Sequence, residues 1–317
     1  MFDGLIVRKD GRTFFENVIL EDLAQRFGTP LYVYSNKVLE TQINKAKEAL
    51  GGLNFDIAYA TKANYNVNIL KVLKQNGCKI DVVSMGEIFL AQKAGFNPEE
   101  MVFNGNGKTP KELEWAIENN IFMLNIDNLE EVELVQKIAS NLHKKVNASL
   151  RLNPEVEADV HPHDATGSHQ SKFGMSFEQA YELLKNAKKY KNIDFIGIHT
   201  HIGSQILDFE PYLKTFKKVE DFLKDTREFF APEFYNIGGG WGIKYRDSER
   251  EFDIEKFREK VLPYLKTFKL NIIVELGRYL VAPSAVLLSR VLRVKERKGK
   301  IFVVLDAGMN DLIRPAL

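Results

Sequence analysis

The chain has 317 residues, and its 44% hydrophobic and 27% charged content is typical of a globular protein rather than a disordered one. The formal net charge of +1 gives no reason to expect a nucleic-acid or membrane partner. The single cysteine, Cys78, excludes an intrachain disulfide and favours a reducing compartment, so we expect a cytoplasmic protein.

The beginning of the chain alternates short apolar runs with helical patterns. Residues 5–7 and 31–34 predict strands, and residues 21–27 predict a helix that is closed by Gly28. Apolar residues at helical spacing over 36–50 predict a second helix.

A regular alternation of apolar runs and amphipathic helices follows. The runs are rich in Val, Ile and Phe, as strands covered on both faces should be. This order predicts an α/β fold, a (β/α)8 barrel of the TIM type. An open doubly wound sheet is the alternative, and the motif positions described below argue against it. The predicted strands are 55–60, 79–83, 101–103, 122–126, 146–152, 193–199, 234–237 and 271–275. The predicted helices are 67–75, 86–94, 110–119, 128–141, 177–190, 209–229 and 254–268.

The pattern changes after the eighth run, where β-like runs follow one another without helices between them. They predict the start of an antiparallel β domain, and about 40 residues are too few to close such a domain with its own core. We therefore expect residues 1–35 to join this β domain, residues 36–278 to form the barrel, and residues 279–317 to begin an incomplete C-terminal domain that continues beyond Leu317. The runs are 280–281, 285–288, 291–294 and 301–305.

Polar residues and glycines follow the predicted strands at their carboxyl ends, where (β/α)8 barrels build their active sites. The richest segment is 199–205, because a strand interior could not satisfy so many polar groups whereas a strand end lining a pocket can. The other strand ends carry Lys62 and Asn64, Asp81 and Ser84, Asn104, Asn125 and Asp127, Arg151 and Asn153, Gly238–Gly240, and Glu275 and Arg278.

Lys62 directly follows the first barrel strand, so its side chain starts inside the barrel mouth. A lysine that faces carboxylates at Asp81 and Glu275 is suited to form a Schiff base, whereas an ordinary surface lysine extends to solvent. Glu275 itself has two interpretations. It could form an ion pair with Arg278, or it could hold the protonated nitrogen of a pyridine cofactor.

The glycine run Gly238–Gly240 after the seventh strand predicts a phosphate cradle, because loops seven and eight bind phosphate in this fold. A bare triple glycine could also be only a tight turn. Ser204 could add a hydroxyl donor to such a cradle.

His199 and His201 alternate at a strand end and could ligate zinc. Further ligands are not predicted at other strand ends, so we expect no metal and expect one imidazole to stack on a flat cofactor. Cys78 precedes the second strand at the opposite end of the barrel, where a structural role is expected. The remaining histidines are His143 in a predicted helix and His161, His163 and His169 in the polar insertion 154–172.

These motifs resemble the fold-type III pyridoxal-phosphate decarboxylases, and the resemblance runs from about residue 5 to the end. The insertion that ends at 167–175 is similar to the diaminopimelate branch of that family more than to the ornithine branch. The sequence departs from the family at Leu276, where proline is usual. The motifs that carry the resemblance are Tyr59–Asn64, Asp81–Ser84, His199–Gln205, Gly238–Gly240 and Glu275–Arg278.

The resemblance implies pyridoxal 5'-phosphate as the cofactor. Lys62 would bind it as a Schiff base, His201 would stack on its ring, and both would be catalytic. Arg278 and Arg314 would bind the substrate carboxylate. The cofactor-binding residues would be Lys62, Asp81, His201, Ser204, Gly238, Gly239, Gly240, Glu275, Gly277 and Arg278.

The resemblance also implies an activity, that of a carboxy-lyase converting meso-2,6-diaminopimelate to L-lysine, the last step of lysine biosynthesis. The expected assembly is a homodimer with shared active sites, whose catalytic cysteine lies beyond Leu317 and comes from the partner subunit. The alternatives are a decarboxylase of ornithine, arginine or carboxynorspermidine, a non-catalytic barrel that binds the cofactor, and a zinc hydrolase.

Overall fold

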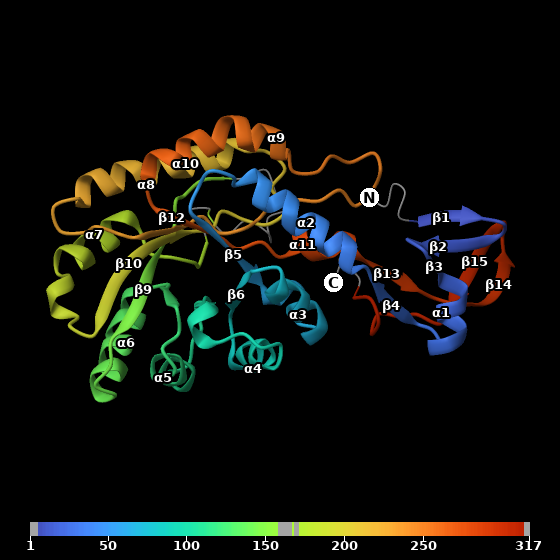
Figure 1. The fold of residues 1–317 in the computed structure, drawn as a ribbon, viewed down its shortest axis with the longest axis horizontal. Helices are drawn as coiled ribbons and strands as arrows, with labels where there is room; N and C mark the ends of the chain where they lie inside the picture. Colours follow the sequence, from blue (N-terminus) through green and yellow to red (C-terminus); the bar gives the residue numbers. More distant parts are fainter. Residues whose placement is uncertain (1–5, 158–166, 168–170, 314–317) are drawn as a thin grey trace. The chain divides into compact units, whose positions relative to one another are not determined.

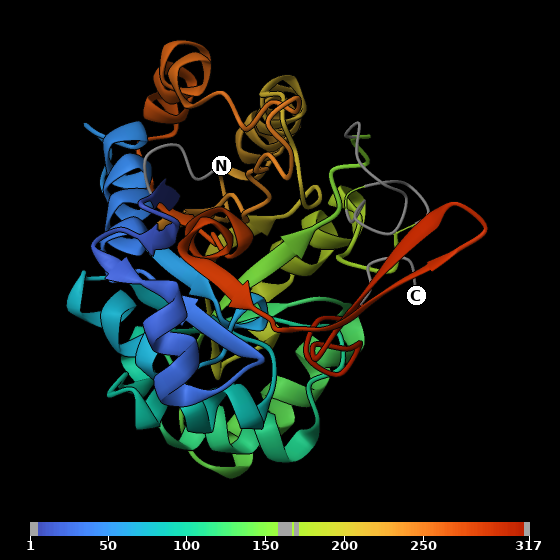
Figure 2. The same ribbon diagram turned by 90° about the vertical axis from the view of Figure 1, so that its right-hand side faces the viewer.

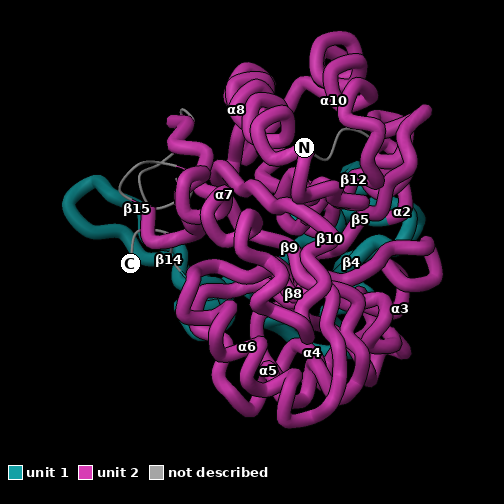
Figure 3. Tube along the Cα trace, turned by 90° about the vertical axis from the view of Figure 1, so that its left-hand side faces the viewer, with its two compact units in different colours: residues 1–39, 282–317 teal, residues 40–281 magenta. Residues whose placement is uncertain are grey.

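The computed structural model describes residues 6–157, 167 and 171–313. The chain divides into two compact units, residues 1–39 with 282–317 and residues 40–281 (Figure 3). The units divide after residues 39 and 281, whereas the sequence predicted segment ends at residues 35 and 278.

The larger unit contains the predicted barrel. Among the described residues, parallel strands close in the order β10-β11-β12-β5-β6-β7-β8-β9, so the barrel expected from the alternating pattern is confirmed. The doubly wound alternative is wrong, because β12 pairs with β5 and closes the sheet on itself. The strands are β5 (Phe55–Ala60), β6 (Lys79–Val82), β7 (Met101–Phe103), β8 (Met123–Ile126), β9 (Val146–Leu152), β10 (Ile193–Thr200), β11 (Phe234–Asn236) and β12 (Asn271–Val274).

Helices connect consecutive strands and lie around the outside of the barrel, as Figure 1 and Figure 2 show. They begin with side-chain caps in several cases, such as Ser84 before α4 and Thr109 before α5. They are α2 (Asn36–Ala49), α3 (Val67–Gln75), α4 (Met85–Lys93), α5 (Pro110–Glu118), α6 (Leu129–Asn141), α7 (Phe177–Lys185) and α8 (Glu210–Thr226). Short 3-10 turns are η1 (Thr61–Ala63), η2 (Pro98–Glu100) and η4 (Ala187–Lys189).

The predicted helix at 254–268 is interrupted. It divides into α9 (Ile254–Lys256), the π-helix η5 (Phe257–Val261) and α10 (Leu262–Phe268). Pro263 stands in the first turn of α10 and has no N–H to donate, so the regular hydrogen-bond ladder cannot continue through it.

The buried apolar cluster of the barrel and the polar residues at the carboxyl ends of its strands project from the same face of the strands. Ala58, Val102, Met123 and Ile273 form a fully buried cluster. Side chains two residues apart in a strand point to the same side. Stepping two residues toward the carboxyl ends therefore leads from the cluster to the polar strand-end residues, which are Asn104 after Val102, Asn125 after Met123 and Glu275 after Ile273.

The run at 280–281 is not a strand. It belongs to α11 (Arg278–Val281), whose turn is closed by backbone hydrogen bonds from Leu280 and Val281 to the carbonyl of Gly277. A short apolar run has no periodicity long enough to separate a buried helical turn from a strand, which is why the sequence pattern was misleading here.

The smaller unit consists of short antiparallel sheets. β1 (Ile6–Lys9), β2 (Arg12–Phe15) and β3 (Val18–Ile19) form one sheet and are followed by α1 (Leu20–Phe27). β4 (Leu31–Tyr34) pairs with β13 (Ala285–Leu288), which follows the 3-10 turn η6 (Ala282–Ser284). β14 (Val291–Arg297) and β15 (Lys300–Leu305) form a hairpin. Residues from both ends of the chain thus build these sheets, as the pattern predicted. None of the described helices is long and apolar enough to cross a bilayer.

Candidate active site

The carboxylate of Glu275, directly after β12, is held by asparagine side chains from neighbouring strands. The side-chain amides of Asn104 and Asn236 donate to Glu275 Oε1 at 2.6 Å each, and that of Asn125 donates at 3.3 Å. The second oxygen, Oε2, lies 3.2 Å from Nε2 of His199, which is almost fully buried. We call these three asparagines the asparagine cage.

This environment keeps Glu275 ionised. Burial by itself would raise the pKa of Glu275, but His199, Lys62 and the amide donors outweigh burial and lower that pKa. The result is a buried anion at the barrel mouth whose charge is supported by hydrogen bonds from several strands.

Lys62 lies in the 3-10 turn that follows β5, beside a second buried carboxylate. Its Nζ is 3.1 Å from Oδ2 of Asp81, whose other oxygen accepts a 2.7 Å hydrogen bond from Asn104. Although protein surrounds Lys62 closely enough for burial to oppose its charge, Asp81 and Glu275 outweigh burial and raise the pKa of Lys62. Burial raises the pKa of Asp81. The Lys62 side chain is 57% exposed, so a ligand can reach its amine.

The loops after β10 and β11 are joined by backbone hydrogen bonds. Ile206 N–H donates to the carbonyl of Gly240 at 2.8 Å, and Gly242 N–H donates to the carbonyl of Ile206 at 2.8 Å. The buried hydroxyl of Tyr212 donates to the carbonyl of Gly239 at 2.7 Å. These bonds fix the glycine run beside the segment that carries His201 and Ser204.

Glycine is required in this run for steric reasons. A Cβ on Gly239 would overlap the carbonyl of Glu275, and Gly238 and Gly240 adopt φ values of +67° and +103°. Side chains rarely adopt that backbone region. The glycines therefore allow two barrel loops to approach each other closely, which a tight turn alone would not require.

His201 is held in one tautomer by the glycine run. Its Nδ1 accepts a 3.2 Å hydrogen bond from the backbone N–H of Gly239. Burial, together with the positive charges of Arg151 and Lys62, lowers the pKa of His201 to about 3. The imidazole is therefore neutral at physiological pH.

Arg278, the first residue of α11, reaches across to the loops of β10 and β11. Its guanidinium donates to Oγ of Ser204 at 3.1 Å and to the hydroxyl of Tyr245. Gly277 precedes it, where a Cβ would come within 3.1 Å of Ala60. A guanidinium and a hydroxyl next to a glycine loop form a donor set suited to an anion.

Arg151 of β9 anchors the segment that follows the polar insertion. Its guanidinium lies 4.5 Å from the ring centroid of Phe173 and 3.8 Å from Oδ1 of Asp127. The same Asp127 oxygen accepts a 3.1 Å hydrogen bond from the backbone N–H of Gly174. The sequence predicts only that Arg151 lies at a strand end and gives no role for its side chain.

The predicted site residues other than Arg314 all lie at the carboxyl ends of the barrel strands or in the loops that follow them. Arg314 lies outside the described residues, as do His161, His163 and His169. Cys78 precedes β6 at the amino end and is buried, which raises the pKa of its thiol to about 11. Within the described ranges no group of three or more His, Cys, Asp or Glu is arranged to hold a metal.

Sequence reasoning missed Asn236, Tyr212 and Tyr245. Asn236 is the last residue of β11, and its position two residues before the glycine run was the available signal. Asn104 and Asn125 were recognised as strand-end residues, but their convergence on Glu275 was not.

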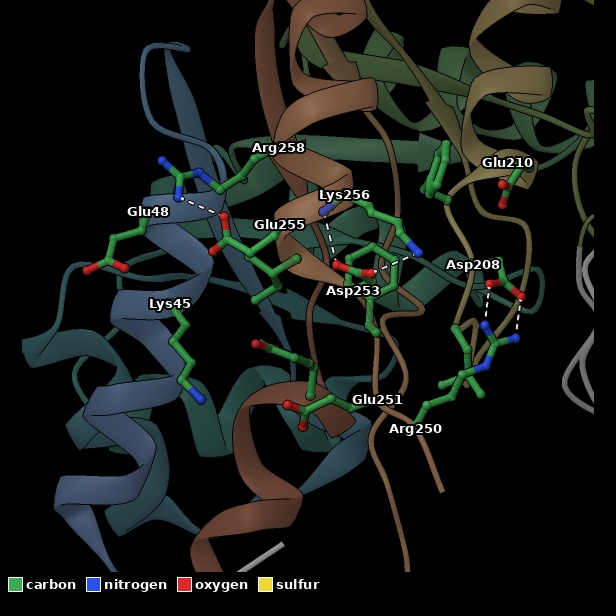
Figure 4. Close-up of a pocket in the computed structure, with 15 residues that line it drawn as sticks. Lys45, Glu48, Asp208, Glu210, Arg250, Glu251, Asp253, Glu255, Lys256 and Arg258 are labelled. Atoms are coloured by element: carbon green, nitrogen blue, oxygen red, sulfur yellow. Dashed lines mark hydrogen bonds and ion pairs between the residues drawn. The ribbon is translucent and has the colours of Figure 1, made fainter. Parts of the chain in front are cut away.

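A separate pocket of about 610 Å³ lies between α2 and the loops after β10 and β11 (Figure 4). Its lining includes the ion pairs Arg250–Asp208, Lys256–Asp253 and Arg258–Glu255, at 2.8, 3.3 and 3.3 Å. None of the predicted site residues lines this pocket.

A protein-family model described as "Pyridoxal-dependent decarboxylase, pyridoxal binding domain" matches residues 36–282. The chain belongs to the pyridoxal-dependent decarboxylases. It is 40% identical to a diaminopimelate decarboxylase of Aquifex aeolicus over a match of 310 residues. The match covers 98% of this chain and 73% of the relative.

Solved structures of diaminopimelate decarboxylases are similar to the fold of this chain. The crystal structure of diaminopimelate decarboxylase from Methanocaldococcus jannaschii has a TM-score of 0.91 at 36% identity, covering 99% of this chain and 76% of that one. The enzyme from Helicobacter pylori, solved in complex with L-lysine, has a TM-score of 0.88 at 38% identity, covering 93% of this chain and 75% of that one.

The residues of this decarboxylase fit pyridoxal phosphate. An accessible amine at Lys62, an ionised carboxylate at Glu275 and a neutral imidazole at His201 match the aldehyde, the ring nitrogen and the ring face. The glycine run approaches its neighbours too closely for side chains, and Arg278 with Ser204 presents a guanidinium and a hydroxyl, which are groups suited to a phosphate.

Proposed function

We propose that this pyridoxal-dependent decarboxylase removes one α-carboxyl group of meso-2,6-diaminopimelate as carbon dioxide and produces L-lysine. The observation that carries the proposal is an accessible lysine 3.1 Å from a buried aspartate, at the same barrel end as an ionised glutamate. The substrate is supported by relatives at 36–40% identity that bear the name diaminopimelate decarboxylase.

Nζ of Lys62 binds the cofactor, and Asp81 accepts the proton that Nζ must release. The raised pKa of Lys62 means that the amine is protonated in the structure described here, so it must release a proton before it can act as a nucleophile. Oδ2 of Asp81 is in hydrogen-bond contact and can accept that proton, and burial raises the pKa of Asp81 toward this task.

Glu275 sets the charge of the ring. Bound pyridoxal phosphate supplies an electron-withdrawing ring that accepts the electrons left behind when carbon dioxide departs. An ionised Glu275, supported by the asparagine cage, keeps a proton on the ring nitrogen by charge-assisted hydrogen bonding. His201 remains neutral and covers one ring face without competing for that proton.

The glycine run, Ser204, Gly277 and Arg278 bind the phosphate. Their positions after β10, β11 and β12 correspond to the loops that bind phosphate in this fold. Arg278 and Arg314 bind substrate carboxylate, since a guanidinium matches a carboxylate with paired hydrogen bonds.

We further propose that the enzyme works in the cytoplasm as a homodimer with shared active sites. Light scattering coupled to size exclusion tests the assembly directly. A mass of one subunit of 36.3 kDa at all concentrations would contradict it.

The substrate is tested by measuring carbon dioxide release from diaminopimelate, ornithine, arginine and carboxynorspermidine in parallel, with the product identified by mass spectrometry. We expect L-lysine from diaminopimelate as the preferred product. A higher kcat/KM on ornithine, arginine or carboxynorspermidine would favour another decarboxylase of this fold. Absence of release in a single-turnover assay on all four would favour a non-catalytic cofactor-binding barrel.

A further inference from the structure

Lys108 is a buried lysine that the proposed reaction does not use. It lies between β7 and α5, and its side chain has no exposed surface. Lysine is almost never fully buried unless it is paired. Burial lowers the pKa of Lys108, and contact with the carboxylate of Glu131 opposes that change.

The Lys108 ammonium is matched by acceptors for its hydrogens. Nζ donates to the carbonyl of Gly105 at 2.6 Å, to the carbonyl of Asn125 at 2.8 Å and to Oε1 of Glu131 at 2.6 Å. The other oxygen of Glu131 accepts a 2.9 Å hydrogen bond from the backbone N–H of Asp127. An ammonium has three donors, so this geometry satisfies it completely.

Two of these acceptors, the carbonyls of Gly105 and Asn125, belong to the backbone that carries two members of the asparagine cage. Gly105 directly follows Asn104, and Asn125 is itself a member of the cage. The two side chains are also linked, because the amide of Asn125 donates to Oδ1 of Asn104 at 2.7 Å. Lys108 therefore contacts the backbone carbonyls of Gly105 and Asn125, while the side-chain amides of Asn104 and Asn125 contact Glu275.

We propose that Lys108 is a positioning residue for Glu275. By joining the carbonyls of Gly105 and Asn125 at one point, it keeps the amides of Asn104 and Asn125 aimed at Glu275 Oε1. This inference rests on the proposed function, in which Glu275 meets the ring nitrogen of the cofactor.

The local backbone gives a reason for such a device. Gly105 has a φ of +107°, and the segment 105–107 contains a second glycine, so the loop has little conformational preference of its own. Functional groups must be held within about 0.5 Å of their working geometry, and supporting hydrogen bonds are what achieve this. The Lys108 ammonium supplies such hydrogen bonds to the carbonyls of Gly105 and Asn125.

The test compares two ligands on the apo-protein, pyridoxal phosphate and its deaza analogue, in which C–H replaces the ring nitrogen. The analogue cannot engage Glu275 through that atom. We expect Lys108→Met to weaken binding of pyridoxal phosphate roughly tenfold and to leave binding of the analogue nearly unchanged, by analogy with the loss of contacts that support metal ligands, which lowers metal affinity by about tenfold or more. Equilibrium dialysis measures both affinities without reference to activity.

Lys74→Met is the matched control. Lys74 also pairs with a glutamate, Glu100, at 2.8 Å and also donates to a backbone carbonyl, that of Gly95. It makes no contact with the cage, so its replacement is expected to leave both affinities as in the unaltered protein.

Glu275→Gln separates this inference from the proposed function. We expect it to abolish the preference for pyridoxal phosphate over the analogue. If Glu275→Gln leaves the preference intact, the placement of Glu275 at the ring nitrogen is wrong. If Glu275→Gln abolishes it and Lys108→Met does not change it, the positioning role of Lys108 is wrong.

A double variant, Lys108→Met with Glu131→Met, tests whether the lysine serves only stability. Removing both charges eliminates the unpaired buried carboxylate that the single variant leaves, so we expect stability to recover. The carbonyls of Gly105 and Asn125 remain without the ammonium, so we expect the preference to stay reduced. Recovery of both stability and preference would assign Lys108 a structural role alone.

Discussion

The backbone N–H of Gly239 donates to Nδ1 of His201 at 3.2 Å, which places the hydrogen of the neutral imidazole on Nε2. Protonation of Nδ1 would set two N–H donors against each other. The glycine run and the imidazole therefore depend on each other, because the loop needs an acceptor and the ring needs a donor.

This relationship predicts a pH dependence of stability. The pKa of His201 is about 3 in the folded protein, against 6.5 for an ordinary histidine, so the unfolded chain takes up a proton that the folded protein refuses. Stability is fully present above pH 6.5 and falls as the pH decreases toward 3, by at most about 1.4 kcal/mol per pH unit for one group. Urea unfolding between pH 8 and 4.5 should show this fall for the unaltered protein and a flatter profile for His201→Phe. Parallel profiles would exclude the assignment.

Lys62→Ala should abolish covalent attachment of the cofactor, because its Nζ is the amine placed beside Asp81 at the barrel mouth. Reduction with borohydride followed by mass spectrometry should add one cofactor to the unaltered protein and none to the variant. Lys79→Ala is the control, since Lys79 pairs with Asp56 at 3.4 Å near the amino ends of the strands. Attachment that persists without Lys62 would identify a different lysine.

Asn236→Asp should move the acid limb of the pH–activity profile to higher pH. The aspartate can still accept the 2.9 Å hydrogen bond from Gly238 N–H, but it replaces an amide donor to Glu275 with a second carboxylate. Like charges raise the pKa of Glu275, so its ionised form is lost at a higher pH than in the unaltered enzyme. The profile of kcat/KM against pH measures the shift, and an unchanged acid limb would argue against a role for ionised Glu275.

Gly239→Ala should destabilise the protein by about 2 kcal/mol or more, because the new methyl group overlaps the carbonyl of Glu275 and backbone cannot move aside cheaply. Cofactor affinity should fall with it. Gly107→Ala is the matched control in another strand-end loop, where a Cβ meets nothing within 4 Å. Equal melting temperatures for the two variants would contradict the steric argument.

The sequence by itself determined the barrel and the end of the barrel at which polar residues and glycines gather. Apolar runs separated by amphipathic helices are a local signal, since burial on both faces and helical periodicity are written into consecutive residues. The strand-end positions of Lys62, Asp81, the glycine run and Glu275 could therefore be read in order along the chain.

Only the tertiary structure decided which side chains meet. Asn104 and Glu275 are 171 positions apart, and they touch because β12 pairs with β5 and closes the sheet. The partner of Arg278 was decided in the same way, since its guanidinium donates to Ser204 and Tyr245 of distant loops. Hydrogen-bond partners across a closed barrel depend on strand register and loop geometry, and neither is encoded in the period of hydrophobic residues.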